Sequence, residues 1–311
     1  MDLMPAYVRE QLLKNGSAMP ETDHIPVVKY FDPCGAATWL ITGCSTGIGR
    51  EVALAALAKG HRVAVSARDP ASVEDLVRAH PEQAIACRLD VTDREQIVAA
   101  IAATEQAFGA IDVLVNNAGY GYMEALEEGE DREVRRLFDT NYFGVVDTIK
   151  AVLPSMRARR SGHIVNMSSM TGLVANPPNV YYSSTKFALE ALTEALAKEV
   201  APFGIKVTAI EPGAIRTDWG TRSMQESATP IEDYAATVGQ RKLLIKAYAD
   251  KLPGDPAKVA AAVLMVTELE NPPLHLLLGL DVLAAFRQKL ADLASSVDEW
   301  EATTKDVSFA K

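Results

Sequence analysis

Short apolar runs recur along the chain from residue 38 onward, separated by longer segments with helical periodicity. Such continuous short runs are typical of strands that are buried on both faces of a parallel sheet. The runs lie at 38–42, 62–67, 84–89, 111–115, 163–167 and 206–210. Strands that alternate with helices predict an α/β fold: one doubly wound (Rossmann) parallel sheet with helices on both faces.

Local signals mark where several of the intervening helices begin and end. A helix N-terminus favours a short polar capping residue, followed by proline in the first turn or by an acidic residue three positions later. Gly60 stands where the first helix, about 48–59, should stop. The predicted starts are Asp69-Pro70, Thr92 with Glu95 for a helix to about residue 108, and Asp255-Pro256 for a helix to about residue 268.

Two segments depart from this alternation. Residues 1–36 carry prolines and mixed charges with little periodicity, so we expect a leader that is an arm or partly disordered. The remaining residues, 37–311, would form a single domain. Within it, residues 214–254 form a long insertion before the last capped helix. Long ordered loops in compact domains are usually functional, so we expect this insertion to serve the substrate site.

Composition and charge exclude several classes of function. Of 311 residues, 48% are hydrophobic and 23% are charged, as expected of a globular protein with a sizeable core. The formal net charge of −10 argues against a nucleic-acid partner or an anionic membrane, because both need a cationic face. No apolar run approaches the ~18 residues of a membrane span, and the N-terminus lacks a secretory pattern. Three scattered cysteines form no disulfide framework, so we expect reduced thiols, no bound metal and a cytoplasmic location.

A glycine-rich loop, "TGCSTGIG" over residues 42–49, joins the first predicted strand to the first helix. Its spacing would let backbone N–H groups approach the pyrophosphate of a dinucleotide. The same loop contains G-x-S-x-G around Ser45, the nucleophile elbow of serine hydrolases. That alternative needs a later acid and histidine, and the candidates His163 and His275 lie where structural histidines are common. Because no strand pattern precedes Ser45, the dinucleotide hypothesis is favoured.

The end of the second strand bears on which dinucleotide would bind. An acidic residue there accepts a hydrogen bond from the ribose 2′-hydroxyl, whereas a cation suits a 2′-phosphate. This chain has Ala67 followed by Arg68. We therefore expect NADP(H) rather than NAD(H); in the alternative, Arg68 is only a solvated charge at the strand end.

Tyr182 and Lys186 lie four residues apart, so on a helix they share a face, whereas Tyr181 points elsewhere. With this pair the chain resembles the short-chain dehydrogenase/reductase family. The matching motifs, in family order over roughly residues 38–285, are TGCSTGIG (42–49), LDVTD (89–93), NNAG (116–119), Asn141, NMSS (166–169), Tyr182-x-x-x-Lys186 and PGAIRT (212–217). The segment PNVYYSSTKFALEAL is most similar in sequence to the branch of the family that contains 17β-hydroxysteroid and retinol dehydrogenases.

The resemblance implies roles for the matching residues. The implied catalytic residues are Asn141, Ser169 (rather than Ser168), Tyr182 and Lys186. In the family, the asparagine supports a water that connects the lysine to solvent. Together with Arg68, the implied cofactor-binding residues are Gly43, Ser45, Thr46, Gly47, Ile48, Gly49, Asp90, Val91, Asn117, Tyr182, Lys186, Pro212, Gly213, Ile215 and Thr217.

The implied reaction is hydride transfer between NADP(H) and a ketone or secondary alcohol. The cofactor supplies the hydride, so the protein must supply a proton and hold the carbonyl. A free tyrosine, with a pKa of about 10, is a poor base near neutrality, so we expect Lys186 and the positive nicotinamide of the oxidised cofactor both to favour the phenolate of Tyr182. Ser169 would donate to the substrate oxygen. The alternatives are an NADP-binding sensor without turnover and a serine hydrolase that uses Ser45.

The insertion at 214–254 predicts a lid over the substrate. Ligands bind beyond the carboxyl ends of the strands of a doubly wound sheet, where this segment must lie. Its apolar and aromatic residues are Trp219, Met224, Ile231, Tyr234, Leu243, Leu244, Ile245 and Tyr248. We expect a bulky apolar substrate of steroid, retinoid or aromatic kind; alternatively, residues of about 232–250 form a helix that simply packs on the body. We also expect a homodimer or homotetramer.

Overall fold

The computed structural model of the chain describes residues 35–217, 224–225, 230–307 and 309. The expected leader therefore lies outside the described residues, except for its last two positions, and so does Trp219 of the insertion. Among the described helices, none is both long enough and apolar enough to cross a membrane.

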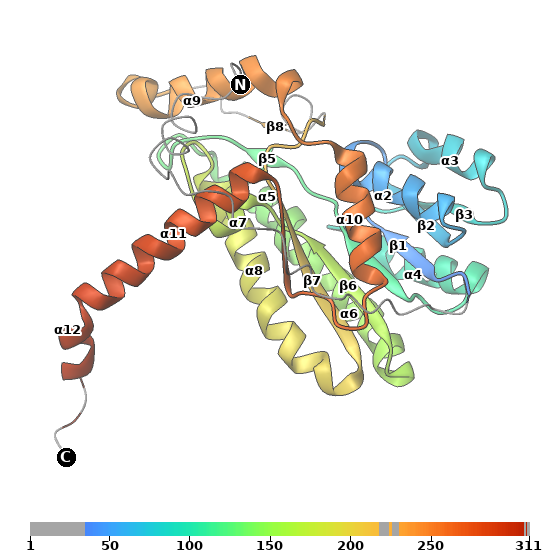
Figure 1. Cartoon of the computed structure of the whole chain (residues 1–311). Coiled ribbons are helices and arrows are strands. Elements are labelled where there is room, and N and C mark those ends of the chain that lie inside the picture. Colours follow the sequence, from blue (N-terminus) through green and yellow to red (C-terminus); the bar gives the residue numbers. More distant parts are fainter. Residues whose placement is uncertain (1–34, 218–223, 226–229, 308, 310–311) are drawn as a thin grey trace, which may run out of the picture.

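Seven parallel strands form the central sheet, in the order β3-β2-β1-β4-β6-β7-β9 (Figure 1). The strands are β1 (Thr38–Ile41), β2 (Arg62–Ala67), β3 (Ala84–Arg88), β4 (Val113–Asn116), β6 (Gly162–Met167), β7 (Ile205–Pro212) and β9 (His275–Leu278). Six of them coincide with the predicted apolar runs. The strand order reverses between β1 and β4, and a doubly wound sheet opens a crevice at that switch point. The predicted fold class is confirmed.

Strand β9 was not predicted from the sequence. It pairs with β7 in parallel register, Ala209 with His275 through Pro212 with Leu278, and forms the edge of the sheet. Two prolines lie shortly before this strand, and its first residue is a histidine. Both features make the sequence less typical of a buried strand. An edge strand tolerates them because only one of its sides must pair.

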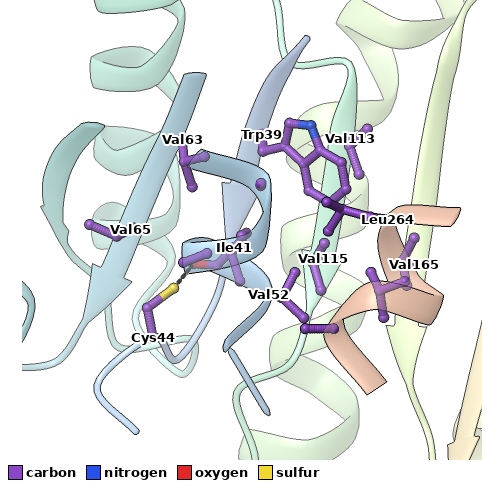
Figure 2. Close-up of a cluster of buried hydrophobic side chains, with 14 of the residues drawn as sticks. Trp39, Ile41, Cys44, Val52, Val63, Val65, Val113, Val115, Val165 and Leu264 are labelled. Carbon is purple, nitrogen blue, oxygen red and sulfur yellow. Dashed lines mark hydrogen bonds between the residues drawn. The ribbon is translucent and has the colours of Figure 1, made fainter. Parts of the chain in front are cut away.

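Two apolar clusters cover the two faces of the sheet. Successive residues of β1 point to opposite faces, so Trp39 and Ile41 enter one cluster and Leu40 enters the other. The first cluster packs α2 (Gly47–Ala58) and α10 (Pro256–Thr267) on the sheet, and Figure 2 shows Val52 of α2 and Leu264 of α10 within it. The second contains side chains of α4 (Arg94–Phe108), α6 (Gly144–Arg159) and α8 (Val180–Val200).

The capping signals are largely confirmed. Asp69 and Asp255 each accept a hydrogen bond from the backbone N–H two residues later, at 3.1 and 2.9 Å. The box predicted at Thr92 and Glu95 is wrong by one residue. Asp93 is the N-cap of α4, and its carboxylate accepts from the backbone N–H groups of Glu95 and Gln96 at 3.0 and 3.2 Å. Asp90 Oδ1 instead accepts from the Thr92 hydroxyl, which removes Thr92 from the helix end.

Shorter elements surround the carboxyl end of the sheet. They include a second, two-stranded sheet of β5 (Gly121–Tyr122) and β8 (Met224–Gln225). The remaining helices are η1 (Pro70–Val73), α3 (Glu74–Ala79), α5 (Asp131–Phe138), the π-helix η2 (Asp139–Phe143), α7 (Met170–Leu173), η3 (Ala201–Phe203), η5 (Glu232–Tyr234), the π-helix η6 (Ala235–Gly239), α9 (Gln240–Tyr248), η7 (Ala249–Lys251), α11 (Leu280–Glu299) and α12 (Glu301–Asp306).

Candidate active site

A cavity of about 600 Å³ lies where the carboxyl ends of the central strands meet the glycine loop. Most of the predicted site residues line it: Gly43, Ser45, Thr46, Gly47, Ile48, Arg68, Asp90, Val91, Asn117, Ser169, Tyr182, Pro212, Gly213, Ile215 and Thr217. Gly49, Asn141 and Lys186 do not line it and lie behind its wall. The structure thus brings together residues as far apart in the sequence as Gly43 and Thr217.

The glycine loop is shaped to accept an anion. Gly43 and Gly47 have φ values of 74° and 61°, which side chains disfavour. Thr46 occupies the N-cap of α2, but no side chain caps the helix there. The first backbone N–H groups of α2 therefore face the cavity with the positive end of the helix dipole. A dinucleotide pyrophosphate fits the chemistry of this position.

Two of the predicted cofactor residues hold this loop in place. Asn117 donates from Nδ2 to the carbonyl oxygens of Thr42 and Gly43, at 2.9 and 3.0 Å. A Cβ atom on Gly49 would lie 2.2 Å from Asn117 Nδ2, so no larger residue fits without displacing the amide. Gly49 therefore serves the close packing of the loop, while Asn117 both supports the loop and lines the cavity.

Arg68, Asp90 and Val91 lie at the ends of β2 and β3, on the same side of the cavity as the glycine loop. Asp90 Oδ1 accepts from the Thr92 backbone N–H at 3.0 Å, which orders the turn after β3. Ala67, just before Arg68, also lines the cavity. The end of β2 therefore carries the cation Arg68. It lacks the carboxylate that would accept a hydrogen bond from the ribose 2′-hydroxyl of NAD(H).

Tyr182, Lys186 and Ser169 form the chemical centre at the other end of the cavity. Tyr182 and Lys186 lie on consecutive turns of α8, with Lys186 Nζ 5.7 Å from the centre of the tyrosine ring. Lys186 Nζ also donates to the carbonyl oxygen of Met167 at 2.7 Å, which fixes the ammonium behind the ring. Ser169 caps α7, and its side chain is hydrogen-bonded to Tyr182.

Burial shifts the protonation of this centre. It raises the pKa of Tyr182 well above the usual value, although the hydrogen bond with Ser169 acts in the opposite direction. Burial also lowers the pKa of Lys186 to about 8, and the negative charge of Glu190 partly opposes that shift. The protein's own groups thus favour the phenol form of Tyr182, and the expected stabilisation of the phenolate by Lys186 and the positive nicotinamide of the oxidised cofactor stays a prediction. A phenol is the form that can give a proton to a substrate oxygen.

The structure discriminates between the neighbouring candidates that the sequence offered. The Tyr181 hydroxyl donates to the carbonyl oxygen of Leu126, and its ring stacks on Tyr122 with the centroids 5.8 Å apart. Tyr182 alone of the two lines the cavity. Ser168 also lines the cavity, but its side chain lies beside Glu190, whereas Ser169 is the serine that is hydrogen-bonded to Tyr182. The geometry therefore supports Ser169 and Tyr182.

Asn141 lies in the π-helix η2 and is buried. Its Nδ2 donates to the Tyr120 carbonyl oxygen at 2.8 Å, and its Oδ1 accepts from the Tyr120 backbone N–H at 3.1 Å. A third bond, at 3.3 Å, joins it to Thr185 on α8. The side chain thus ties the loop after β4 to the helix that carries Tyr182 and Lys186.

A buried cluster that sequence spacing did not predict lies behind Lys186. Glu190, Glu211 and His275 have ligand atoms within 4.8 Å of one another, and His275 Nδ1 lies 2.7 Å from Glu211 Oε1. Burial raises the pKa of Glu211 to about 9, and the nearby Glu190 carboxylate adds to the shift. The three residues come from α8, β7 and the unpredicted β9. Because these elements are far apart in sequence, no local motif contains all three residues.

Neither histidine of the hydrolase alternative lines the cavity that contains Ser45. His275 belongs to the glutamate cluster. His163 Nε2 lies 2.9 Å from Thr208 Oγ1, and burial lowers the pKa of His163 to about 3. Both therefore occupy structural positions within the sheet.

The described part of the insertion contributes to the cavity wall and is tied to the segment after β5. Lys242 on α9 forms a buried ion pair with Glu124 at 2.7 Å, and the Ile231 backbone N–H donates to Glu128 at 2.8 Å. Ile245 and Leu252 line the cavity, whereas Leu243, Leu244 and Tyr248 are exposed. The alternative that residues of about 232–250 are helical is confirmed in η5, η6 and α9, but most of their apolar side chains do not pack on the body.

Several cavity residues were not predicted. They include Tyr120, Met123, Arg136, Met170, Asn179 and Leu252. Tyr120 follows the NNAG motif and Met170 follows NMSS, so proximity to those motifs was the available signal. Leu252 fell within the insertion but gave no pattern of its own.

Comparison with known proteins identifies the family. The model described as short chain dehydrogenase matches residues 37–228, and a second model, described only as a protein of unknown function, matches residues 3–60. Oxidoreductase BOA17 of Botryotinia fuckeliana is 40% identical over 262 residues, which are 84% of this chain and 95% of that protein. A 3-ketodihydrosphingosine reductase of Bacteroides thetaiotaomicron is 38% identical over 241 residues, covering 77% and 87%.

Solved structures of similar proteins support the same family assignment. A short-chain dehydrogenase from Streptomyces avermitilis superposes with a TM-score of 0.83 at 42% identity, covering 89% of this chain and all of that chain. ElxO with NADP bound gives a TM-score of 0.65 at 30% identity, covering 78% and 96%. The chain belongs to the short-chain dehydrogenase family and is an oxidoreductase of that family.

Proposed function

We propose that this protein uses NADPH to reduce the carbonyl group of a bulky apolar ketone. The observation that carries the proposal is that the glycine loop, Arg68, Ser169 and Tyr182 line one continuous cavity with apolar side chains of the insertion. NADP(H), when bound, supplies or accepts the hydride. The chain's own residues then have to bind it, orient the carbonyl and move one proton.

The proton chemistry supports reduction as the favoured direction. The Tyr182 hydroxyl is the proton donor to the carbonyl oxygen, and burial keeps it protonated near neutrality. Ser169 donates to the same oxygen and stabilises the charge that develops on it. Lys186 supplies positive charge behind the phenol and is held by the carbonyl oxygen of Met167. Asn141 positions α8 and the loop after β4 around this centre.

Arg68 supports NADP(H) over NAD(H). Arg68 lines the cavity together with the glycine loop, and its guanidinium suits a 2′-phosphate, whereas no carboxylate stands at Ala67 to accept from a 2′-hydroxyl. The similarity to ElxO, whose structure has NADP bound, agrees with this choice.

The walls support an apolar substrate. Met123, Met170, Ile245 and Leu252 line the cavity, and the last two come from the insertion, which acts as a lid that excludes water. The relative named as a 3-ketodihydrosphingosine reductase agrees with a keto substrate. A steroid, retinoid or aromatic ketone has the same apolar character.

A homologous series of ketones tests the proposal. Each buried methylene contributes roughly 0.8 kcal/mol of transfer free energy, so kcat/KM with NADPH should climb by about threefold to fourfold per methylene until the cavity is full. Ile245→Ser should flatten the climb, and Leu244→Ser, at the adjacent exposed position, should not. A flat series in the unaltered protein, or a preference for small charged ketones, would contradict an apolar site.

A further inference from the structure

The buried cluster of Glu190, Glu211 and His275 brings three side chains with metal-ligand atoms to one point near the edge of the sheet. One such atom of each residue lies within 4.8 Å of the other two. Glu190 and Glu211 are only 5 and 0% exposed, whereas the side chain of His275 is 33% exposed. Solvent therefore reaches the cluster through the histidine. Carboxylates that are buried to this degree are normally paired with a cation or coordinate a metal ion.

Several oxygen atoms at this cluster have no hydrogen-bond partner among the residues that the structure describes. They are both carboxylate oxygens of Glu190, Oε2 of Glu211 and the hydroxyl oxygen of Ser168, which lies beside Glu190 and is also buried. A Cβ atom on Gly172 would lie 2.7 Å from Ser168 Oγ and 3.1 Å from Glu190 Oε1, so only glycine leaves these two oxygens uncrowded. Because unpaired buried polar atoms are costly, the cluster calls for a further partner.

The positive charge near the cluster does not balance its carboxylates. Lys186 acts on Glu190 electrostatically, but its Nζ is held by the carbonyl oxygen of Met167. Glu194 adds a third carboxylate, with Oε1 3.7 Å from His275 Nε2. Burial raises the pKa of Glu190 and of Glu211, since their charged forms are poorly compensated. A proton on Glu211 relieves the repulsion without a metal, whereas a divalent cation would stabilise both buried carboxylates at once.

The distances within the cluster suit one metal ion. With bonds of roughly 2.1 Å, the ligand atoms of a tetrahedral zinc site lie about 3.4 Å apart. His275 Nδ1 lies 3.4 Å from Glu190 Oε2 and 2.7 Å from Glu211 Oε1, so small side-chain movements would produce this geometry. A histidine ligand usually donates its other ring N–H to a carboxylate, which orients the ring. Glu194 lies beside Nε2 and can accept that hydrogen.

We propose that Glu190, Glu211 and Nδ1 of His275 bind a divalent transition-metal ion with the ligand preferences of Zn²⁺. An imidazole nitrogen with two carboxylates suits Zn²⁺, whereas Mg²⁺ and Ca²⁺ prefer oxygen ligands alone. The ion joins α8, β7 and β9, and so fastens the edge strand to the sheet and to the helix that carries Tyr182. Its role is structural, and it is independent of the proposed ketone reduction. The proposal departs from the expectation that the protein binds no metal.

Calorimetric titration of the full-length, tag-free protein with Zn²⁺, after treatment with EDTA and its removal, tests this site. One Zn²⁺ should bind per chain with a Kd of about 1 µM or lower, and Mg²⁺ should bind far more weakly. Saturating Zn²⁺ should raise the Tm, because the ion binds only the folded arrangement. Loss of an outer partner alone typically weakens a metal site roughly 10–100-fold, so Glu190→Gln and His275→Gln should each weaken Zn²⁺ binding by more than about 100-fold.

Two control variants separate this site from adventitious binding. Glu194→Gln should weaken Zn²⁺ binding only about tenfold, as expected of an outer partner. His80→Gln removes a histidine at the end of α3 and should leave the affinity unchanged. NADPH binding and far-UV circular dichroism check that each variant is folded, and Glu190→Gln, which keeps the side-chain shape, suffices if His275→Gln is not.

Anomalous X-ray diffraction from crystals grown with Zn²⁺ locates the ion. The expected result is one peak between Glu190, Glu211 and His275. The proposal would be overturned by the absence of Zn²⁺ binding to the unaltered protein up to about 100 µM free ion, or by full affinity in a folded Glu190→Gln variant. Anomalous peaks at surface histidines alone would also overturn it, and would show that the cluster is balanced by protons.

Discussion

Lys186 stands one helical turn beyond Tyr182 on α8, with its Nζ 5.7 Å from the centre of the tyrosine ring and 2.7 Å from the carbonyl oxygen of Met167. The ammonium is therefore fixed behind the phenol by the strand β6, while Ser169 approaches the tyrosine from α7. Three separate elements define the position of one hydroxyl group. Tyr181, the neighbouring residue with the same chemistry, is instead directed away from this centre, towards the carbonyl oxygen of Leu126 and the ring of Tyr122.

Removal of the Tyr182 hydroxyl tests its role as proton donor. Tyr182→Phe should retain NADPH binding, because the ring still fills its site, while kcat for ketone reduction should fall by about 10²–10⁴-fold. Tyr181→Phe is the matched control, and its kcat should change little. NADPH fluorescence measures the binding and absorbance at 340 nm the turnover. Equal activity of the two variants would show that the roles are wrongly assigned.

The charge at the end of β2 should determine the choice of cofactor. Arg68→Ala should lower kcat/KM for NADPH by about 10–100-fold, because the contact with the 2′-phosphate is lost, and should leave the value for NADH nearly unchanged. Adding Ala67→Asp should then favour NADH by accepting from the ribose hydroxyl. The two kcat/KM values are measured side by side. An unaltered protein that already prefers NADH would contradict the assignment of Arg68.

The pH profile of reduction should follow the charge of Lys186. The pKa of this lysine is lowered to about 8, so the ammonium is present below that pH and is lost as the pH rises through it. Reductase activity should therefore decline above about pH 8. Glu190→Gln removes a negative charge that raises the lysine pKa, so the decline should move to lower pH with little change in kcat at pH 6. A profile that does not respond to this substitution would separate the decline from Lys186.

Stability should depend on pH through Glu211. Its folded-state pKa is raised to about 9, above an unfolded value near 4.5, so the folded state holds a proton that the unfolded state releases. The free energy of unfolding should therefore fall as the pH rises between these values, by at most about 1.4 kcal/mol per pH unit. Glu211→Gln should flatten this slope. Glu194→Gln, at an exposed position, should keep it, and denaturant unfolding at pH 5, 7 and 9 distinguishes the two.

The ion pair between Lys242 and Glu124 should hold the lid. Lys242→Met leaves the buried carboxylate of Glu124 without this partner, so the lid should open more readily and KM for an apolar ketone should rise several-fold. The exposed Lys258→Met on α10 serves as the control for loss of one positive charge. Equal KM values for the two variants would show that the insertion does not depend on this contact.

The sequence predicted those features that local chemistry determines. A short-range sequence pattern marks each of the six predicted strands, the glycine loop and the Tyr182–Lys186 pair. The structure places all of these features as expected. The capping of α4 shifted by one residue because Asp93 competes with Thr92, whose hydroxyl is bound by Asp90. Strand β9 and the Glu190–Glu211–His275 cluster escaped prediction, since an edge strand has a weak pattern and the cluster joins three distant segments. The protonation of Tyr182 also depends on burial, which no spacing reveals.

Isotope transfer measures the central claim most directly. The protein is incubated with NADPH that carries deuterium at the transferable position of the nicotinamide and with a bulky apolar ketone, and the product is analysed by mass spectrometry. The account predicts one deuterium on the former carbonyl carbon of each alcohol formed, at a rate that falls by orders of magnitude in Tyr182→Phe. Tight NADPH binding without any labelled alcohol across the ketone series would contradict it and would indicate a protein that binds the cofactor without turnover.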